Sequence, residues 1–423
     1  MIFLLFIVLL LLGMPLAFCL LVSGLSYFVL ADSLPMLVAV QRMVAASQSF
    51  PLLAVPFFIL AGHIMNHSGI TQRLVHFSNV LVAWIAGGLA HVTIVLSALM
   101  GGVSGSAIAD AAMQSRILGQ PMQDSGLSRG FSAAAICVSA LITACIPPSI
   151  GLILYGYIGN VSIGKLFIAG LLPGLLLTLT MMLVVYWQAK KHGFKADNAV
   201  KPTGKQILVA MNDCKWALLF PIILIVTIRF GIFTPSEAGA FAVVYACVVG
   251  KLAYTTLTLQ QIIQSLYESV SDIGMIMLII LASGIIGYVV AFEQLPVTIT
   301  ESMLSLTQQP ILIMFIALFL LLCIGVIMEG TVTVLLLTPI LVPMVQSVGI
   351  DPVHFGILMM IMVTFGGTTP PVGVAMYAVC NILKCPTSEY IKGAWPFFAA
   401  VIFLVAVLAV FPSAVMFLPN LLF

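Results

Sequence analysis

Four short breaks, rich in glycine, proline and hydroxyl residues, interrupt the long apolar runs of this 423-residue chain. The first two read Met100-Gly-Gly-Val-Ser-Gly-Ser-Ala107 and Thr143-Ala-Cys-Ile-Pro-Pro-Ser149. The other two read Met328-Glu-Gly-Thr-Val-Thr333 and Phe365-Gly-Gly-Thr-Thr-Pro-Pro371. Glycines allow close approach of the backbone, and hydroxyl oxygens can join carbonyl oxygens in uncharged cages. Cages of this kind suit a hard monovalent cation such as Na+.

Two carboxylates accompany the glycine breaks. Asp110 follows Ser106 by four residues, so both lie on one face of a helix that leaves the break, and Glu329 lies inside the second glycine break. Carboxylates inside a membrane are costly and usually functional, which makes both residues candidates for ion coupling. The alternative is that either one caps the N-terminus of a half-helix.

Composition indicates that these breaks lie in an integral membrane protein. Hydrophobic residues make up 62% of the chain and charged residues 7%, far from the quarter or so typical of soluble proteins. Runs without charge cover 1 to 31, 43 to 72, 74 to 109, 130 to 164, 166 to 189, 302 to 328, 352 to 383 and 393 to 423. Most exceed the ~20 residues of one spanning helix, so several must hold a bent or re-entrant pair. We expect about 11 to 12 membrane segments.

The breaks repeat in register across two halves of the chain. Pro147 and Pro370 are 223 residues apart, as are Gly170 and Gly393, while Gly105 and Gly330 are 225 apart. This agreement predicts a duplication, with a first repeat over 1-189, a polar linker over 190-215 and a second repeat over 216-423. Glycine breaks lie near 100-107 and 328-333, and Pro-Pro breaks near 143-149 and 366-371. Paired interruptions at matching positions are typical of a transporter's binding site.

The distribution of cations predicts that the two repeats are inverted. The linker is the most basic segment, with Lys190, Lys191, Lys195, Lys201 and Lys205. By the positive-inside rule it is cytoplasmic, as are the loops near Arg116 and Lys384, whereas 293 to 310 carries acids without a cation. The first glycine break therefore precedes a cytoplasmic loop and the second an external one. The segment before Arg42 holds no Lys or Arg, so a retained first helix is expected instead of a cleaved signal peptide.

Other kinds of chemistry have weaker support. Gly102-Val-Ser-Gly105 matches the GxSG string of rhomboid-type intramembrane proteases, but no histidine or lysine is suitably placed in the sequence to act as its base. A passive channel would not require inverted broken helices. The eight cysteines form no CxxC pair, and His63 and His67 have no carboxylate near them in the sequence. We expect no cofactor, no enzymatic activity, and no metal besides sodium.

Seven segments of the chain resemble the large membrane subunit of tripartite ATP-independent periplasmic (TRAP) transporters, the DctM-like group of the ion-transporter superfamily. They are Ala54-Val-Pro-Phe-Phe-Ile-Leu-Ala-Gly62, Ser104-Gly-Ser-Ala107 with Asp110, Ile146-Pro-Pro-Ser149, Lys165-Leu-Phe-Ile-Ala-Gly170, Gly231-Ile-Phe-Thr-Pro-Ser-Glu-Ala-Gly239, Leu337-Thr-Pro-Ile340 and Thr369-Pro-Pro-Val-Gly373. The resemblance implies an all-α polytopic membrane protein with an inverted repeat, two re-entrant hairpins and two unwound helices, working as an elevator. It also implies Na+-driven uptake of an organic acid, such as a C4-dicarboxylate, sialic acid or another sugar acid. Proton-coupled transport of an organic anion is the alternative.

The resemblance further implies partners and site residues. The partners would be a small membrane (Q) subunit of four helices and a periplasmic solute-binding (P) protein, in the bacterial inner membrane. One sodium site would use Ser104, Gly105, Thr143 and Ile146, and the other Gly330, Thr333, Gly366 and Thr369. Substrate would lie between Ser106, Pro147, Thr331 and Pro370, with Asp110 and Glu329 available for coupling. The wider group carries Ser-Asn-Thr at its tips, where this chain has Ser104-Gly-Ser and Glu329-Gly-Thr, so backbone carbonyls would do more of the ligation.

Overall fold

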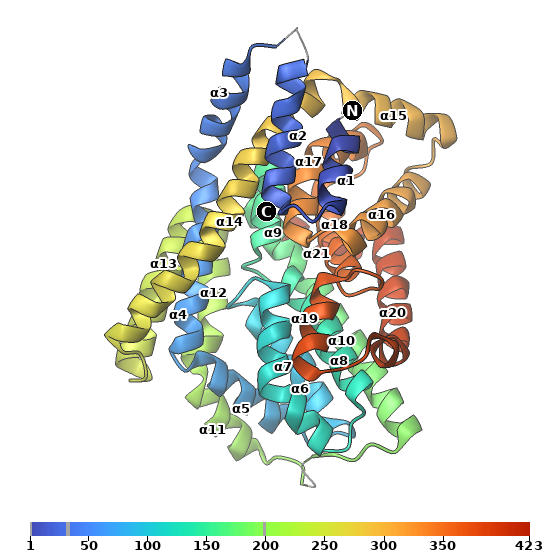
Figure 1. Cartoon of the computed structure of the whole chain (residues 1–423). Coiled ribbons are helices and arrows are strands. Elements are labelled where there is room, and N and C mark those ends of the chain that lie inside the picture. The colour runs from blue at the N-terminus through green and yellow to red at the C-terminus, as the bar shows by residue number, and fades with distance from the viewer. Residues whose placement is uncertain (1, 31–33, 198–199) are drawn as a thin grey trace.

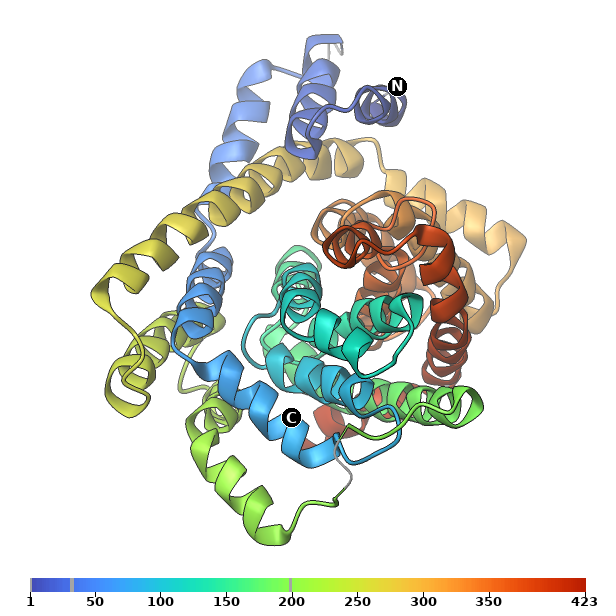
Figure 2. The same ribbon diagram turned by 60° about the horizontal axis from the view of Figure 1, so that its bottom comes forward.

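The computed structural model describes residues 2–30, 34–197 and 200–423, and the regular elements in these ranges are all helices. A central bundle, coloured cyan to red, is flanked by an outer arc that contains the long yellow helix and several blue ones (Figure 2). In this arc α14 (Leu259–Phe292) packs against α2 (Leu16–Leu30), α3 (Met36–Ser47) and α4 (Ala54–His67). The all-α polytopic fold predicted from the sequence is confirmed.

The first half of the chain runs from the outer arc into the central bundle. Its remaining outer elements are α1 (Ile2–Leu11), η1 (Phe50–Leu53) and α5 (Ile70–Val82). Its inner helices are α6 (Gly88–Gly101), α7 (Ala107–Asp124), α8 (Arg129–Cys145), α9 (Ile150–Ile158) and α10 (Ile163–His192). The helical hairpin of α6 and α7 is therefore open over 102–106, and the helix formed by α8 and α9 is broken over 146–149 with a bend of 44°.

The second half repeats this order. Its outer elements begin with α11 (Gly204–Asp213), α12 (Lys215–Arg229), α13 (Pro235–Val248) and η2 (Val249–Ala253), and α14 and α15 (Leu295–Leu306) follow. Its inner helices are α16 (Pro310–Ile327), α17 (Gly330–Ser347), α18 (Pro352–Gly366), α19 (Val374–Leu383), α20 (Thr387–Val410) and α21 (Pro412–Leu422). Here the hairpin tip is short, at 328–329, and the broken helix is open over 367–373.

The two repeats approach the middle of the molecule from opposite ends. Figure 1 places α5, α6 and α7 in the lower half, and α15, α16 and α17 in the upper half. In each half a short helix, α5 or α15, precedes a hairpin, a broken helix and a long helix. Two re-entrant hairpins of opposite direction thus meet two interrupted helices.

Full-length spans are fewer than the 11 to 12 segments expected. Seven helices in the described ranges are long and apolar enough to cross a membrane, or up to nine if each of two bent pairs counts as one span. Whole charge-free runs were the basis of the expectation, and the structure divides several of them into shorter helices. The linker also has more structure than expected, because α10 continues to His192 and a capping box between Thr203 and Gln206 starts α11.

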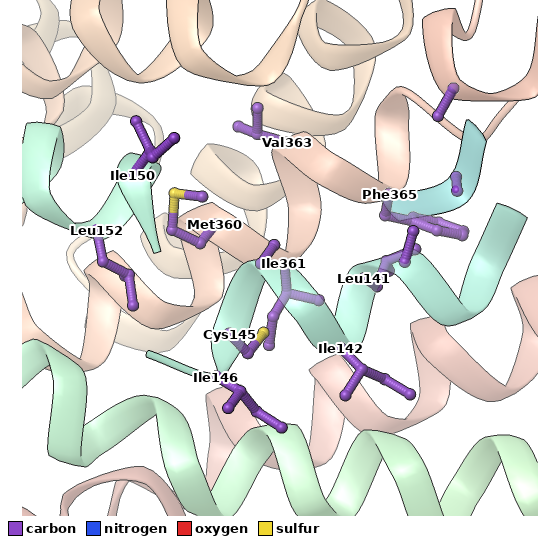
Figure 3. Close-up of a cluster of buried hydrophobic side chains, with 14 of the residues drawn as sticks. Leu141, Ile142, Cys145, Ile146, Ile150, Leu152, Met360, Ile361, Val363 and Phe365 are labelled. Carbon is purple, nitrogen blue, oxygen red and sulfur yellow. The ribbon is translucent and has the colours of Figure 1, made fainter. Parts of the chain in front are cut away.

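The broken helices α8/α9 and α18 pack against each other through apolar side chains (Figure 3). Ile146 and Ile150 flank the first break, and Met360 and Phe365 belong to α18. Gly151 permits the close approach, because a β-carbon there would overlap the end of the Met360 side chain. Side chains of both helices are buried in this contact, so the two breaks border one shared apolar core.

Candidate functional site

The tip of the first hairpin touches the break between α8 and α9. Gly105 has a left-handed backbone (φ +62°), and a β-carbon there would overlap the carbonyl oxygen of Pro148. On the other side of the tip, a β-carbon on Gly101 would lie 2.8 Å from the Cβ of Ile146. Prolines 147 and 148 have no N–H to donate to the carbonyls of Thr143 and Ala144, four residues earlier. Ser104, Gly105, Thr143 and Ile146 are thus placed at one junction of tip and break, with backbone oxygens available.

A buried hydrogen-bond network lies directly behind this junction. The Thr143 hydroxyl donates to Oδ2 of Asp110 at 2.6 Å, and the amide nitrogen of Gln114 donates to the same oxygen at 3.1 Å. Gln114 also donates to the Ser97 hydroxyl at 2.7 Å, and Ser97 donates to Ser139 at 3.0 Å. Asp110 is 1% exposed, and its Oδ1 has no hydrogen-bond partner.

That free oxygen matters because an isolated buried carboxylate is strongly unfavourable. The charged form needs a cation or another donor beside it, and the neutral form needs a proton. The arrangement around Asp110 can therefore hold either a metal ion or a proton. Asp110 does not cap α7, since Ser106 accepts the capping bond from the N–H of Ala109 at 3.5 Å.

The second junction has a different geometry. Gly366 approaches α16 so closely that a β-carbon would lie 2.5 Å from the carbonyl carbon of Gly325. Gly330, Thr331 and Thr333 lie in the first turn of α17 instead of in an open loop. Thr333 donates its hydroxyl hydrogen to the carbonyl of Glu329 at 3.0 Å, and Thr369 to that of Gly366 at 2.8 Å. Both hydroxyl oxygens keep lone pairs for a further ligand.

The Glu329 carboxylate accepts hydrogen bonds from the backbone at this junction. One of its oxygens accepts the N–H groups of Thr331 at 2.9 Å and Val332 at 3.3 Å, and the other accepts the Thr331 hydroxyl at 2.9 Å. These contacts make Glu329 the N-cap of α17, which is the alternative that the sequence left open for it. The two acids of the repeats thus have unlike environments.

The four residues predicted to contact substrate differ in accessibility. Ser106, Thr331 and Pro370 are partly exposed, while Pro147, in the break between α8 and α9, is buried. Pro147 therefore lines no open surface in this conformation. Sequence reasoning did not select Ser97 and Gln114, although a polar residue in an apolar helix is a signal that would have found them.

The outer helices also touch the first tip. A β-carbon on Gly62 of α4 would lie 3.7 Å from the Cα of Ser104, and one on Gly102 would lie 2.9 Å from the Cβ of Pro221 in α12. Ser104 donates its hydroxyl hydrogen to the Met100 carbonyl of the preceding helix at 3.3 Å. The first tip is therefore seated between two helices of the outer arc.

His63 and His67 do have carboxylate neighbours, contrary to expectation from the sequence. Glu268 and Asp272 on α14 meet them across the helix interface, with Nε2 of His63 at 2.9 Å from Asp272 and Nε2 of His67 at 3.3 Å from Glu268. Within the described ranges, no group of three or more His, Cys, Asp or Glu side chains is arranged to hold a metal ion. The histidines tie α4 to α14.

Comparisons of the sequence with known proteins identify the family of this chain. The sequence model of the family described as "Tripartite ATP-independent periplasmic transporter, DctM component" matches residues 3–414. The chain is 37% identical over 409 residues to the sialic acid TRAP transporter large permease protein SiaM of Vibrio cholerae, covering 97% of this chain and 95% of that protein. It is 33% identical to the 2,3-diketo-L-gulonate TRAP transporter large permease protein YiaN of Escherichia coli, covering 97% and 94%. The isethionate TRAP transporter permease protein DctMQ of Oleidesulfovibrio alaskensis is 34% identical, and the match covers 96% of this chain but 64% of that protein.

A solved structure shares the fold at low sequence identity. The YdaH transporter of Alcanivorax borkumensis superposes with a TM-score of 0.66 and 13% identity, over 91% of this chain and 90% of that one. This likeness concerns the fold alone. The relatives named above are transporter permeases, so at the family level the role is transport and not catalysis.

Proposed function

Because this chain belongs to the family of DctM components of tripartite ATP-independent periplasmic transporters, we propose that it takes up a small organic acid by Na+ symport. The observation that carries the proposal is the pairing of each hairpin with a broken helix, through the tip residue Gly105 in one repeat and through Gly366 against Gly325 of α16, just before the tip, in the other. An ion that joins tip to break would close the substrate pocket only when bound. Transport would then depend on the Na+ gradient.

The first ion site would lie where the tip meets the first break. Its ligands would come from Ser104 and Gly105 of the tip and from Thr143 and Ile146 of the break. Asp110 lies behind Thr143 and would supply the negative charge that compensates a buried cation. Oxygen ligands without nitrogen or sulfur favour a hard cation such as Na+.

The second site would use Gly330 and Thr333 of α17 with Gly366 and Thr369 of the second break. Substrate would lie between the two sites, at Ser106, Thr331 and Pro370, with Pro147 exposed after a shift of the hairpin. The N–H groups in the first turn of α17 are already capped by Glu329, so the positive charge of the bound Na+ ions would be what favours a carboxylate between the two sites. Binding of the anion would thus be coupled to binding of the cations.

The names of the relatives support the proposed substrate class and partners. Sialic acid, 2,3-diketo-L-gulonate and isethionate, named for three of them, are all organic acids. The DctMQ relative extends beyond the part that matches this chain, and the extra third has room for a small four-helix membrane (Q) subunit. A periplasmic solute-binding (P) protein would deliver the substrate. The chain would lie in the bacterial inner membrane, with the basic linker 190–215 on the cytoplasmic side.

Proton coupling is a second candidate, and one observation favours it. The Oδ1 of Asp110 is buried without a partner, which suits a carboxylic acid that gains and loses a proton as the hairpin moves. The same network would relay its hydrogen bonds through Gln114 and Ser97. In this version a pH gradient alone would drive accumulation.

The experiment compares Gly105→Ala with Gly126→Ala in proteoliposomes containing this chain, its small partner and the binding protein. Both glycines have left-handed backbones, at φ +62° and φ +88°, so both variants share the backbone cost. Only Gly105 faces Pro148, whereas nothing lies within 4 Å of a β-carbon on Gly126. We expect Na+-driven accumulation to be lost in Gly105→Ala and kept in Gly126→Ala.

Each gradient is imposed separately. Accumulation under a Na+ gradient that is absent under a pH gradient would support the paired ion sites. Accumulation that needs only the pH gradient would instead support proton coupling through Asp110. Equal activity of Gly105→Ala and wild type would contradict a functional role of the tip contact.

A further inference from the structure

A cavity outside the proposed transport site is lined by residues of α5, of α11 and of the segments next to them. Figure 1 shows these two helices at the lower end of the molecule. Its volume is about 610 Å³. Helix α5 leads from α4 into the first hairpin, and α11 follows the basic linker. The side chains that matter for its chemistry are His76, Val80, Trp84, Lys205, Gln206 and Val209. The cavity thus joins two elements that the proposed transport cycle does not use as ligands.

Lysine and aromatic side chains mark this end of the molecule as a membrane surface. Four lysine ammonium groups lie over aromatic rings: Lys190 over Tyr186 at 4.7 Å, Lys191 over Trp187 at 5.2 Å, Lys201 over Trp84 at 5.0 Å and Lys215 over Trp216 at 5.8 Å. Aromatic rings of this kind gather at the level of lipid headgroups, and lysine ammonium groups extend from there toward water. Trp84, which lies under Lys201, also lines the cavity, so the cavity lies beside one of these lysine–aromatic pairs.

The lining combines a cationic edge with an apolar wall. Lys205 and His76 supply the polar edge, and Val80, Trp84 and Val209 supply the wall. Val209 is 62% exposed, and its neighbour Leu208 is 60% exposed, so α11 presents apolar surface beside the opening.

The two nearby acids are already engaged. Asp213 pairs with Arg73 of α5 at 3.5 Å, and Asp197 accepts the N–H of Leu89 at 2.6 Å. Neither carboxylate is therefore paired with Lys205. The cavity has positive charge at its edge and apolar walls inside. These features match a ligand that has an anionic headgroup and an apolar tail.

We propose that this cavity binds an anionic phospholipid, with its phosphate at Lys205 and Lys201 and its acyl chains along Val80 and Val209. Basic pockets between helices on the cytoplasmic side of a membrane recognise such headgroups. A bound lipid would join α5 to α11 and hold both at the membrane surface while the hairpin that follows α5 moves. The site goes beyond the proposed transport function and does not depend on the identity of the transported acid.

The test measures how added lipid changes the thermal unfolding of the purified, delipidated full-length chain in detergent. Phosphatidylglycerol, phosphatidylcholine and inorganic phosphate are titrated separately. The double variant Lys201→Gln/Lys205→Gln removes the proposed phosphate contacts. The control Lys190→Gln/Lys191→Gln removes the same charge from the same surface, but these lysines lie over Tyr186 and Trp187, which do not line the cavity, whereas Lys205 lines it and Lys201 lies over the lining residue Trp84. Lys205→Arg keeps the charge and tests whether a change of side chain alone disturbs folding.

We expect phosphatidylglycerol to raise the melting temperature of wild type and of Lys205→Arg, with phosphatidylcholine and inorganic phosphate having little effect. The phosphatidylglycerol concentration that gives half of the maximal rise in melting temperature should increase by about fivefold for each lysine removed in Lys201→Gln/Lys205→Gln. In the control it should change little. Equal weakening in both double variants would mean diffuse attraction and would overturn the site. Stabilisation by inorganic phosphate alone would overturn the lipid as its occupant, as would an equal effect of phosphatidylcholine.

Discussion

At the scale of single residues, the two acids beside the hairpin tips show how one residue class serves two purposes. Glu329 has both oxygens occupied by donors of its own helix turn. Asp110 instead reaches across to α8, where Thr143 and Gln114 share one oxygen and the other is left without a partner. The physical difference predicts different consequences for removing each charge.

Asp110→Asn should abolish gradient-driven accumulation while leaving the fold intact. The substitution keeps the shape but removes the charge that would balance a buried cation, so we expect a fall of roughly tenfold or more in accumulation, since tenfold requires only about 1.4 kcal/mol. The matched control is Asp124→Asn on the same helix, where the carboxylate is exposed and accepts from Gln120 at 2.8 Å. Full activity of Asp110→Asn would exclude this carboxylate from coupling.

Glu329→Gln should retain transport, because the amide oxygen can still accept N–H groups at the start of α17. Glu329→Ala removes the cap, and we expect it to lower the unfolding free energy by about 1 kcal/mol. Thermal melting and accumulation are measured on both variants. If Glu329→Gln melts like wild type but proteoliposomes that contain it no longer accumulate substrate, the charge of Glu329 takes part in coupling. Capping would then not be the only role of this residue.

At the scale of elements, glycines determine how closely hairpins approach broken helices. In the second repeat α16 and α18 meet at Gly325 and Gly366, each of which would have its β-carbon within 3 Å of the other helix. In the first repeat Gly105 plays a comparable part at the tip itself. Both contacts bring backbone against backbone, so an added side chain at either glycine would force the helices apart.

Gly366→Ala should therefore destabilise the protein far more than Gly330→Ala. A methyl group at 366 forces α16 away, and overpacking of this kind costs about 1–3 kcal/mol. At position 330 the nearest atom to an added β-carbon is Cγ1 of Val363 at 3.5 Å, an ordinary contact. The stabilities are compared through the denaturation midpoints of the two variants in the same detergent. Equal midpoints would show that α16 and α18 can separate at position 366 without loss of stability.

At the scale of the whole molecule, the first hairpin tip is seated between α4 and α12 of the outer arc. A β-carbon on Gly62 would lie 3.7 Å from the Cα of Ser104, and one on Gly102 would lie 2.9 Å from the Cβ of Pro221, so the tip contacts both helices closely. In the proposed elevator cycle the inner bundle would move past the arc, and this contact would have to slide.

A disulfide between Gly102→Cys and Pro221→Cys should stop that movement. The β-carbons would lie 2.9 Å apart, slightly closer than the 3.5–4.5 Å or so of an ordinary disulfide, so a small adjustment is enough to form it. We expect uptake to be lost on oxidation and to return on reduction, with each single variant unaffected by the oxidant. Uptake that persists in the cross-linked protein would contradict sliding of the tip along α12.

The sequence by itself determined the membrane class and the four breaks, because these follow from hydropathy and from proline and glycine chemistry, and its motifs carried the resemblance to the family. Only the tertiary structure decided which break meets which tip, that Glu329 caps its helix, and that Pro147 is buried. It also joined Asp110 to Ser97 and Gln114, and His63 to Asp272. These outcomes depend on contacts between helices distant in sequence, where sub-ångström differences in packing decide which polar group finds a partner and which is left for a ligand.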